Sequence, residues 1–301
     1  MQYRCSELGL NDVHLRCSVF SSLVQSVLSY GCEIWGLEKS YLFSQMNTVH
    51  NHFMKRTLHV RKSVPDGVVL CELGRVPLQL HWQKMILKFV SRLSELPSDR
   101  LVKKAFAHAS STNTPWWQRL SAWLNQHDFE GVLAEGAFSI SNAEQCLRDK
   151  WYSTLCQTSA TKVSSFIDNM FFDSNVMAPY LCSMRPSASR FSLIKFRLGS
   201  HSLRVETDRW ARPKPPREQR VCRHCSMQAV EDEQHFLFDC PFYSIIRGQL
   251  FSLFGPSYQQ RDIRLFFEQN SHQLGFVAHH IHLCFQARMS DESHLAPHPR
   301  L

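Results

Sequence analysis

The chain has no long run of apolar residues and little glycine or proline. A helix that crosses a membrane needs about 18 or more consecutive apolar residues. The most apolar early stretch, residues 19–35, is interrupted by serines, a glutamine and Glu33, so we expect no membrane-spanning segment and no membrane partner. With only 11 Gly and 13 Pro among 301 residues, no long low-complexity segment is expected either.

A secretory signal is also missing from the first residues. They contain two acids and no apolar core, which such a signal requires. We therefore expect a protein that is not secreted and acts inside the cell, in the nucleus or the cytoplasm.

The sequence lacks the common catalytic motifs. No glycine-rich phosphate-binding loop, HExxH zinc-protease motif or GxSxG nucleophile motif occurs. Two-metal phosphoryl transfer needs carboxylates close together, and no two aspartates are adjacent anywhere in the chain. The acidic triplet Glu231-Asp232-Glu233 is interpreted as a solvated face. We expect no enzyme activity from this chain alone and assign no catalytic residue.

Cysteine, by contrast, is plentiful. In a chain without a secretory signal, the eleven cysteines are expected to be reduced thiols or metal ligands. Three of them fall within residues 220–240. The other eight stand alone among apolar or mixed neighbours and are interpreted as small core residues: Cys5, Cys17, Cys32, Cys71, Cys146, Cys156, Cys182 and Cys284.

The net charge of +8 is concentrated in one segment. Between Arg185 and Arg223 lie eleven bases and three acids, whereas the other 23 bases and 23 acids of the chain cancel. A polyanionic partner, RNA or DNA bound through its phosphates, is the first interpretation of such a segment. A solvated basic linker is the alternative.

Apolar residues recur with helical spacing along most of the chain, which predicts a mainly α fold. Turn signals occur at residues 64–67 and 111–115. Strand-like alternation is scarce, and the best candidate is a short hairpin around residues 219–227. The main helices are expected over residues 42–58, 78–93, 100–108, 116–124, 142–155 and 190–210.

Residues 222–240 hold a Cys-x2-Cys pair followed by His-x4-Cys. A Cys-x2-Cys turn lets two thiolates converge on one tetrahedral ion, and the second pair precedes a helix start at Pro241. The spacing predicts a structural Zn²⁺ held by Cys222, Cys225, His235 and Cys240, with no open position for a catalytic water. Chance grouping in a Cys- and His-rich chain is the alternative.

Other histidines and aromatic residues carry weaker signals. His224 is expected to point away from the ion, toward phosphate or solvent. His280 and Cys284 share a helical face, but without a second ligand pair nearby a partly buried helix is favoured over a metal site. Trp116, Trp117 and Trp210 could stack on bases, although core packing is preferred for them.

The stretch RVCRHCSMQAVEDEQHFLFDCPFY, residues 220–243, resembles the C-terminal zinc-binding region of non-LTR (LINE-type) retrotransposon reverse transcriptases. In that pattern Arg-x-Cys-x-x-Cys is followed by VEDE-x-HFL and Cys-Pro-x-Tyr. The preceding FRLGSHSLRVETDRW, residues 196–210, is similar to the family's basic helix. Residues 22–36, 50–78 and the helix after them resemble the region after the polymerase palm, the thumb and its helical extension.

The resemblance covers most of residues 15–250 and implies the template-handling end of a polymerase. The fingers and the palm, with their catalytic aspartates, would lie upstream of residue 1. We therefore expect a thumb-like helical region at 1–110, a helical connection at 111–184, a basic helix with the CCHC zinc module at 185–260, C-terminal helices at 261–289 and a disordered tail at 290–301.

The sequence hypothesis is a catalytically inactive, reverse-transcriptase-derived fragment that binds nucleic acid, RNA in the first place, with zinc stabilising its fold. A zinc-dependent protein-interaction module, other retroelement proteins as partners, or a remnant without function are the alternatives. The residues expected to contact phosphate are Arg190, Lys195, Arg197, Arg204, Arg209, Arg212, Lys214, Arg217, Arg220 and Arg223.

Overall fold

The computed structural model describes Glu7, Gly9 and residues 11–38, 41–134, 138–157 and 176–294. These residues form a mainly α fold without a β-strand, as the apolar spacing predicts. In place of the expected hairpin, a single antiparallel bridge pairs Val221 with Val230. None of the described helices combines the length and apolar character needed to cross a membrane.

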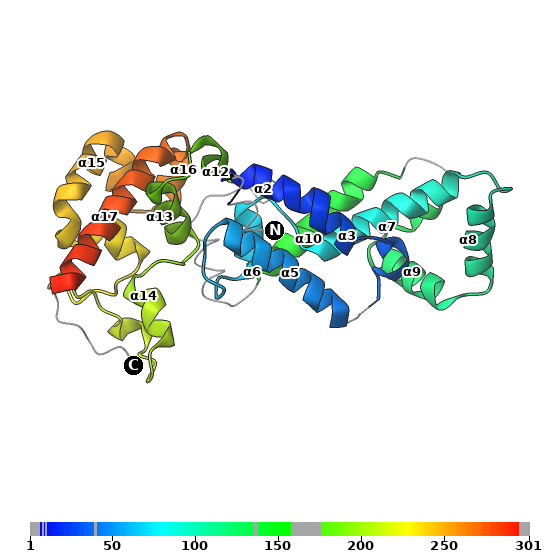
Figure 1. Ribbon diagram of the computed structural model, residues 1–301, viewed down its shortest axis with the longest axis horizontal. Coiled ribbons are helices and arrows are strands. Elements are labelled where there is room, and N and C mark those ends of the chain that lie inside the picture. Colours follow the sequence, from blue (N-terminus) through cyan, green and yellow to red (C-terminus); the bar gives the residue numbers. More distant parts are fainter. Residues whose placement is uncertain are drawn as a thin grey trace. The chain divides into compact units, whose positions relative to one another are not determined.

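The chain divides into two compact units that are interleaved in sequence (Figure 1). Unit 1 comprises residues 1–17, 53–75 and 158–301, and unit 2 comprises residues 18–52 and 76–157. This division differs from the consecutive domains expected from the sequence, because residues 53–75 pack with residues more than a hundred positions further along the chain.

Unit 2 is built around α7 (Leu78–Glu95), which matches the helix expected over residues 78–93 to within two residues. On one side, Ile86 and Val90 pack against α9 (Pro115–Gln126) and α10 (Ile140–Cys156). On the other side, Trp82 packs against Cys32 and the ring of Trp35, both of α4 (Cys32–Trp35), and donates a hydrogen bond from Nε1 to Ser29 Oγ (3.1 Å). The unit also contains α3 (Ser26–Leu28), α8 (Leu101–Ser111) and most of α5 (Tyr41–Thr57).

The starts of two of these helices follow from their sequence. Thr114 accepts a hydrogen bond from the Trp117 N–H, and Pro115 takes the first helical position of α9. Ser139 caps α10 in the same way through the Asn142 N–H.

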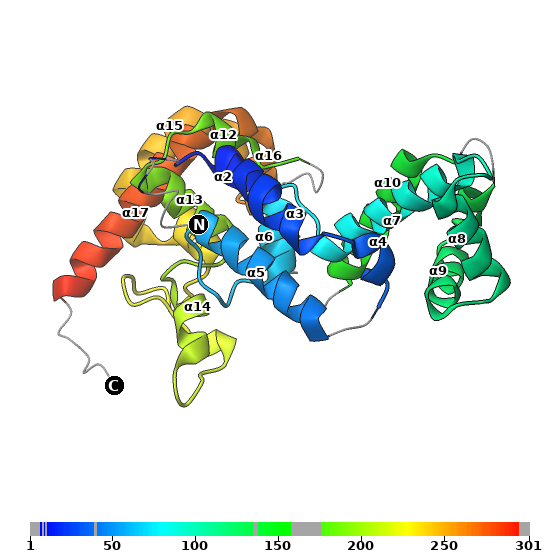
Figure 2. The same cartoon turned by 45° about the vertical axis from the view of Figure 1, so that its right-hand side comes forward.

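In unit 1, α13 (Ala188–Arg197) packs along α17 (Leu274–His294), with α15 (Ser244–Gln259) and α16 (Ile263–Gln269) beside them (Figures 1 and 2). Shorter helices complete the unit: α6 (Asp66–Glu72), α12 (Pro179–Ser183) and α14 (Arg204–Thr207). The helix α2 (Val13–Phe20) begins in this unit.

Two expected boundaries in unit 1 are wrong. The helix expected over residues 190–210 ends at Arg197, because Gly199 adopts a left-handed φ of 57° that a helix cannot continue through. Residues 290–294 of the expected disordered tail form the last turn of α17, whereas residues 295–301 lie outside the described part.

A buried ion pair ties residues 53–75 to the rest of unit 1. The Arg197 guanidinium donates to both oxygens of Glu72 (2.7 and 3.1 Å), and the Tyr180 hydroxyl donates to Glu72 Oε1 (2.6 Å). All three residues are at most 3% exposed. Burial, followed by the neighbouring Glu72 carboxylate, holds the pKa of Tyr180 well above its usual value, so the phenol stays a hydrogen-bond donor.

Replacing Arg197 by leucine is expected to lower the free energy of unfolding by about 3–5 kcal/mol, because it leaves a buried carboxylate without its cation. Urea unfolding followed by circular dichroism measures the change. Arg185→Leu, which removes an exposed arginine, serves as control and should change the free energy by at most about 0.5 kcal/mol. Equal losses in the two variants would contradict a specific role for the buried pair.

Candidate metal centre and basic surface

A β-bridge and a π-helical turn position the metal-ligand residues. The bridge between Val221 and Val230, with a hydrogen bond from the Cys222 N–H to the Ala229 carbonyl (2.8 Å), folds the Cys-x2-Cys loop back on itself. His235 and Cys240 bracket a single π-helical turn, η5 (His235–Asp239), closed by a hydrogen bond from the Cys240 N–H to the His235 carbonyl (2.7 Å). The turn brings residues five apart to the same side of the chain.

The four side chains converge on one point. Cys222 Sγ and Cys240 Sγ are 3.9 Å apart, Cys225 Sγ and His235 Nε2 are 3.4 Å apart, and all four ligand atoms lie within 4.8 Å of one another. A tetrahedral ion with metal–sulfur bonds of about 2.3 Å and metal–nitrogen bonds of about 2.0 Å has ligand edges of roughly 3.8 and 3.5 Å. The cluster therefore has the size to hold a metal ion, and every ligand except the partly exposed Cys225 is buried.

The thiols of Cys222 and Cys240 lie within hydrogen-bond distance of each other (3.9 Å). Their mutual hydrogen bond, with burial, raises the pKa of Cys222 to about 12, and the same hydrogen bond lowers the pKa of Cys240. Because a metal ion binds thiolates, its binding releases the thiol protons of these ligands.

Glu231 and Asp232 of the acidic triplet bond to residues around the metal cluster, so the interpretation of the triplet as a solvated face is wrong. Glu231 is 1% exposed and accepts two hydrogen bonds from the Arg288 guanidinium of α17 (2.9 and 3.0 Å) and one from the Arg204 N–H of α14 (2.8 Å). Asp232 accepts from the His235 N–H (3.0 Å) and pairs with Arg217 (2.7 Å).

His224 does not point to solvent, contrary to expectation. Its side chain is 1% exposed, its Nδ1 lies 2.5 Å from Asp291 Oδ2, and its ring contacts Phe242. The histidine between the two thiols thus joins the Cys-x2-Cys loop to the last turns of α17.

The structure separates the ten expected phosphate contacts into three groups. Three arginines are buried and bonded within the protein, so they are unsuited to contact a phosphate, contrary to expectation. Arg190 donates to the carbonyls of Leu181 and Met184, Arg220 donates to those of Val205 and Pro215, and Arg197 belongs to the Glu72 network.

Three more of the ten bases form ion pairs nearer the surface: Arg204 with Asp208, Arg209 with Glu206 and Arg217 with Asp232. Lys195, Arg212, Lys214 and Arg223 are exposed, and no ion pair links them to an acid of the described residues. These four remain the candidate contacts.

The tryptophans and cysteines singled out in the sequence include both buried and exposed residues. Trp116 packs in unit 2 as expected and donates to the Glu33 carbonyl (3.1 Å), but Trp210 is 64% exposed rather than packed in a core. Of the eight solitary cysteines, four are buried as expected, three are exposed and Cys5 lies outside the described residues; the exposed ones are Cys146, Cys156 and Cys182.

The alternative histidine group forms no metal site. His280 directs Nδ1 to the carbonyl of Phe276 in its own helix (2.8 Å), and within the described ranges only Cys222, Cys225, His235 and Cys240 form a metal-ligand group. In comparisons with known proteins, no family model matches the chain, and no curated protein or solved structure is significantly similar to it.

Elemental analysis of the purified chain is expected to find a single bound ion, and Cys240→Ser is expected to lose it. Loss of a ligand, or addition of a strong chelator, should lower the melting temperature, because the regular backbone structure within residues 220–240 is limited to a short bridge and one π-helical turn, and the four ligand side chains converge there. Cys146→Ser, at an exposed cysteine of unit 2, should change neither metal content nor melting. A metal-free protein with unaltered melting in chelator would contradict the site.

Proposed function

We propose that the chain is a non-enzymatic nucleic-acid-binding protein whose binding region is stabilised by Zn²⁺, with single-stranded RNA as its first ligand. Three thiolates and one imidazole are the donors that structural zinc sites use, and four protein ligands leave no position for a reacting water. The ion would therefore stabilise structure rather than supply chemistry.

The observation that carries the proposal is the exposed segment of residues 210–214, which precedes the metal ligands in the chain. Trp210, Arg212 and Lys214 are exposed in this segment, and Arg223 is exposed between the two thiols of the Cys-x2-Cys loop. Single-stranded nucleic acids are held by bases that bind phosphates and by aromatic rings on which nucleobases stack. Both kinds of side chain are present here without packing partners in a core.

The resemblance of residues 220–243 to the zinc-binding region of non-LTR reverse transcriptases supports the same proposal. On that reading the chain derives from the template-handling end of a retroelement polymerase and acts inside the cell. The mainly helical fold and the clustered ligands fit this origin.

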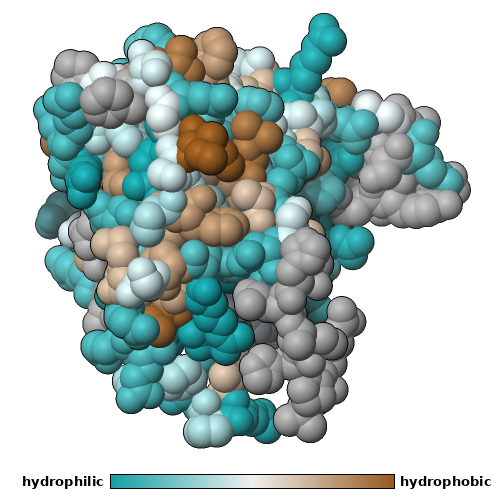
Figure 3. Space-filling model, turned by 90° about the vertical axis from the view of Figure 1, so that its left-hand side faces the viewer, coloured by the Kyte–Doolittle hydropathy of each residue, from teal (hydrophilic) through white to brown (hydrophobic). Residues whose placement is uncertain are grey.

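A protein-interaction module is the second candidate function, favoured by exposed apolar residues on α15. Ile245 is 87% exposed and Leu253 is 52% exposed. Apolar patches stand among hydrophilic residues on this face of unit 1 (Figure 3). A protein partner on α15 would leave the basic segment free.

Reversing three charges in R212E/K214E/R223E is expected to abolish most RNA binding. Each phosphate contact with a single strand contributes about 0.7 to the slope of log K against log salt, so the slope should fall by about 2. Fluorescence anisotropy with a labelled single-stranded RNA at several salt concentrations measures both quantities.

The matched control K88E/R100E/K104E makes the same change in net charge on exposed bases of unit 2. It should retain most of the affinity. If the two triple variants lose binding equally, net charge rather than the proposed surface governs binding. If neither the wild type nor the variants bind RNA, the proposed function is wrong.

Trp210→Ala is expected to weaken RNA binding roughly 5- to 150-fold, because stacking on one base contributes about 1–3 kcal/mol. Its effect on thermal stability should be small, since the ring is 64% exposed. Met227→Ala removes an apolar side chain of similar exposure that cannot stack, and should leave affinity unchanged. Equal effects of the two substitutions on affinity would argue against stacking.

A further inference from the structure

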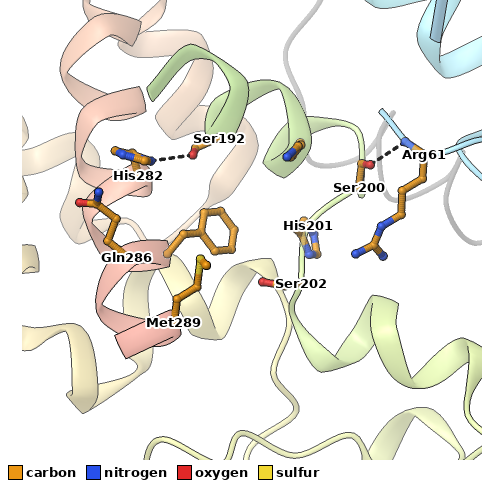
Figure 4. A pocket seen from close by; sticks show the side chains of 10 residues that line it. Arg61, Ser192, Ser200, His201, Ser202, His282, Gln286 and Met289 are labelled. Carbon is orange, nitrogen blue, oxygen red and sulfur yellow. Dashed lines mark hydrogen bonds between the residues drawn. The ribbon is translucent and has the colours of Figure 1, made fainter. Parts of the chain in front are cut away.

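A pocket of about 260 Å³ opens in unit 1 (Figure 4). Its walls come from α13, the turn after α13, α17 and the loop that follows α5. Ten side chains line it, among them Arg61, Lys195, Ser200, His201 and Phe285. Lys195 is the one base of the basic segment that lines the pocket, and none of the four metal ligands does.

The pocket is positively charged and contains no acid among its lining residues. Arg61 and Lys195 are both exposed at its edge. The neighbouring His59 lies close to several bases, among them Lys195 of the pocket. Its pKa is lowered first by burial and then by surrounding bases that include Lys195. An anion is the ligand that this charge favours.

His201 supplies a buried polar atom without a partner. The residue is 2% exposed, and its Nε2 lies 2.9 Å from Glu233 Oε1, so this nitrogen donates to the carboxylate. The other ring nitrogen, Nδ1, is buried and has no hydrogen-bond partner. An unpartnered buried ring nitrogen is costly unless a ligand or water reaches it. Because Nε2 is bonded to Glu233, the unpartnered Nδ1 is the ring nitrogen that remains for a ligand.

The hydroxyls are positioned by the surrounding backbone and side chains. Ser200 Oγ accepts a hydrogen bond from the Arg61 N–H (3.0 Å), which leaves the Ser200 hydroxyl proton available to a ligand. Ser192 Oγ lies 3.0 Å from His282 Nδ1, as the dashed line in Figure 4 shows. The pocket thus combines fixed hydroxyls with two cations.

We infer that this pocket binds a phosphate group of a nucleic-acid strand. Phosphate oxygens accept several charge-assisted hydrogen bonds at once, which matches the convergence of Arg61, Lys195, Ser200 and His201 on one cavity. Phe285 and the exposed Met289 provide an apolar wall for the attached sugar or base. The identity of the strand rests on the proposed function, whereas the affinity for phosphate does not.

Imidazole NMR of the full-length, zinc-loaded chain tests the inference. Inorganic phosphate is titrated at constant ionic strength, with sodium chloride as the compensating salt, and the His201 and His282 rings are followed. Two single-stranded RNA oligonucleotides, one with a 5′-phosphate and one with a 5′-hydroxyl, are titrated in parallel. The expected result is a saturable shift of the His201 ring with phosphate and with at least one oligonucleotide.

Two variants replace exposed bases of the pocket, so the substitutions should not disturb the fold. Arg61→Gln and Lys195→Gln should each weaken phosphate binding several-fold and reduce the salt slope of RNA binding by about 0.7. Lys62→Gln makes the same charge change beside Arg61 but outside the pocket lining, and should leave the His201 shift unaltered.

The outcomes separate this inference from the proposed function. A His201 shift with both oligonucleotides assigns the pocket to an internal phosphodiester, and a shift with the phosphorylated one alone assigns it to a strand end; both support the inference. RNA binding that depends on Arg212, Lys214 and Arg223 but leaves His201 unperturbed overturns the pocket and keeps the function. A shift with inorganic phosphate and with neither oligonucleotide overturns the assignment to a strand.

Discussion

The arrangement of the metal cluster depends on one buried carboxylate. Glu231 receives the Arg288 guanidinium from α17 and a backbone N–H from α14, and its own backbone belongs to the loop between the two ligand pairs. A buried carboxylate at this position is stable only while all of these donors stay in place. The ligand loop, the short helix after α13 and the C-terminal helix are therefore fixed by the same group, and the ion would act on a loop that is already anchored.

The distribution of charge has two separate physical roles. Some arginines of the basic segment neutralise buried acids or satisfy backbone carbonyls, as Arg197 and Arg220 do. Others remain in solvent, as Lys214 does. The excess charge of the segment therefore overstates the number of bases that a polyanion can reach. The reachable ones lie beside the metal loop and at the pocket near His201.

The sequence predicted the features that depend on local residue patterns, namely helices and the spacing of metal ligands. The helices over residues 78–95 and 115–126 follow from apolar spacing and from Pro115 after a capping threonine, and the four ligands follow from their spacing. It failed where a residue's role depends on distant partners. Nothing in the sequence near Arg197 indicates Glu72, which lies 125 positions away, and nothing near Glu231 indicates Arg288. Trp210 has no apolar periodicity of its own, so its exposure could not be predicted. The pocket at His201 draws on three separate stretches of the chain and carries no sequence signature.

The interleaving of the units has a consequence for synthesis on the ribosome. All residues of unit 2 have been synthesised once residue 157 is added. Glu72 of unit 1 lacks its hydrogen-bond partners until Tyr180 and Arg197 have also been synthesised. At about 5–20 residues per second, an arginine 125 positions later arrives roughly 6–25 seconds after the glutamate. During that interval the apolar face of residues 64–73, which is buried in the finished protein, has no partner from the later segments.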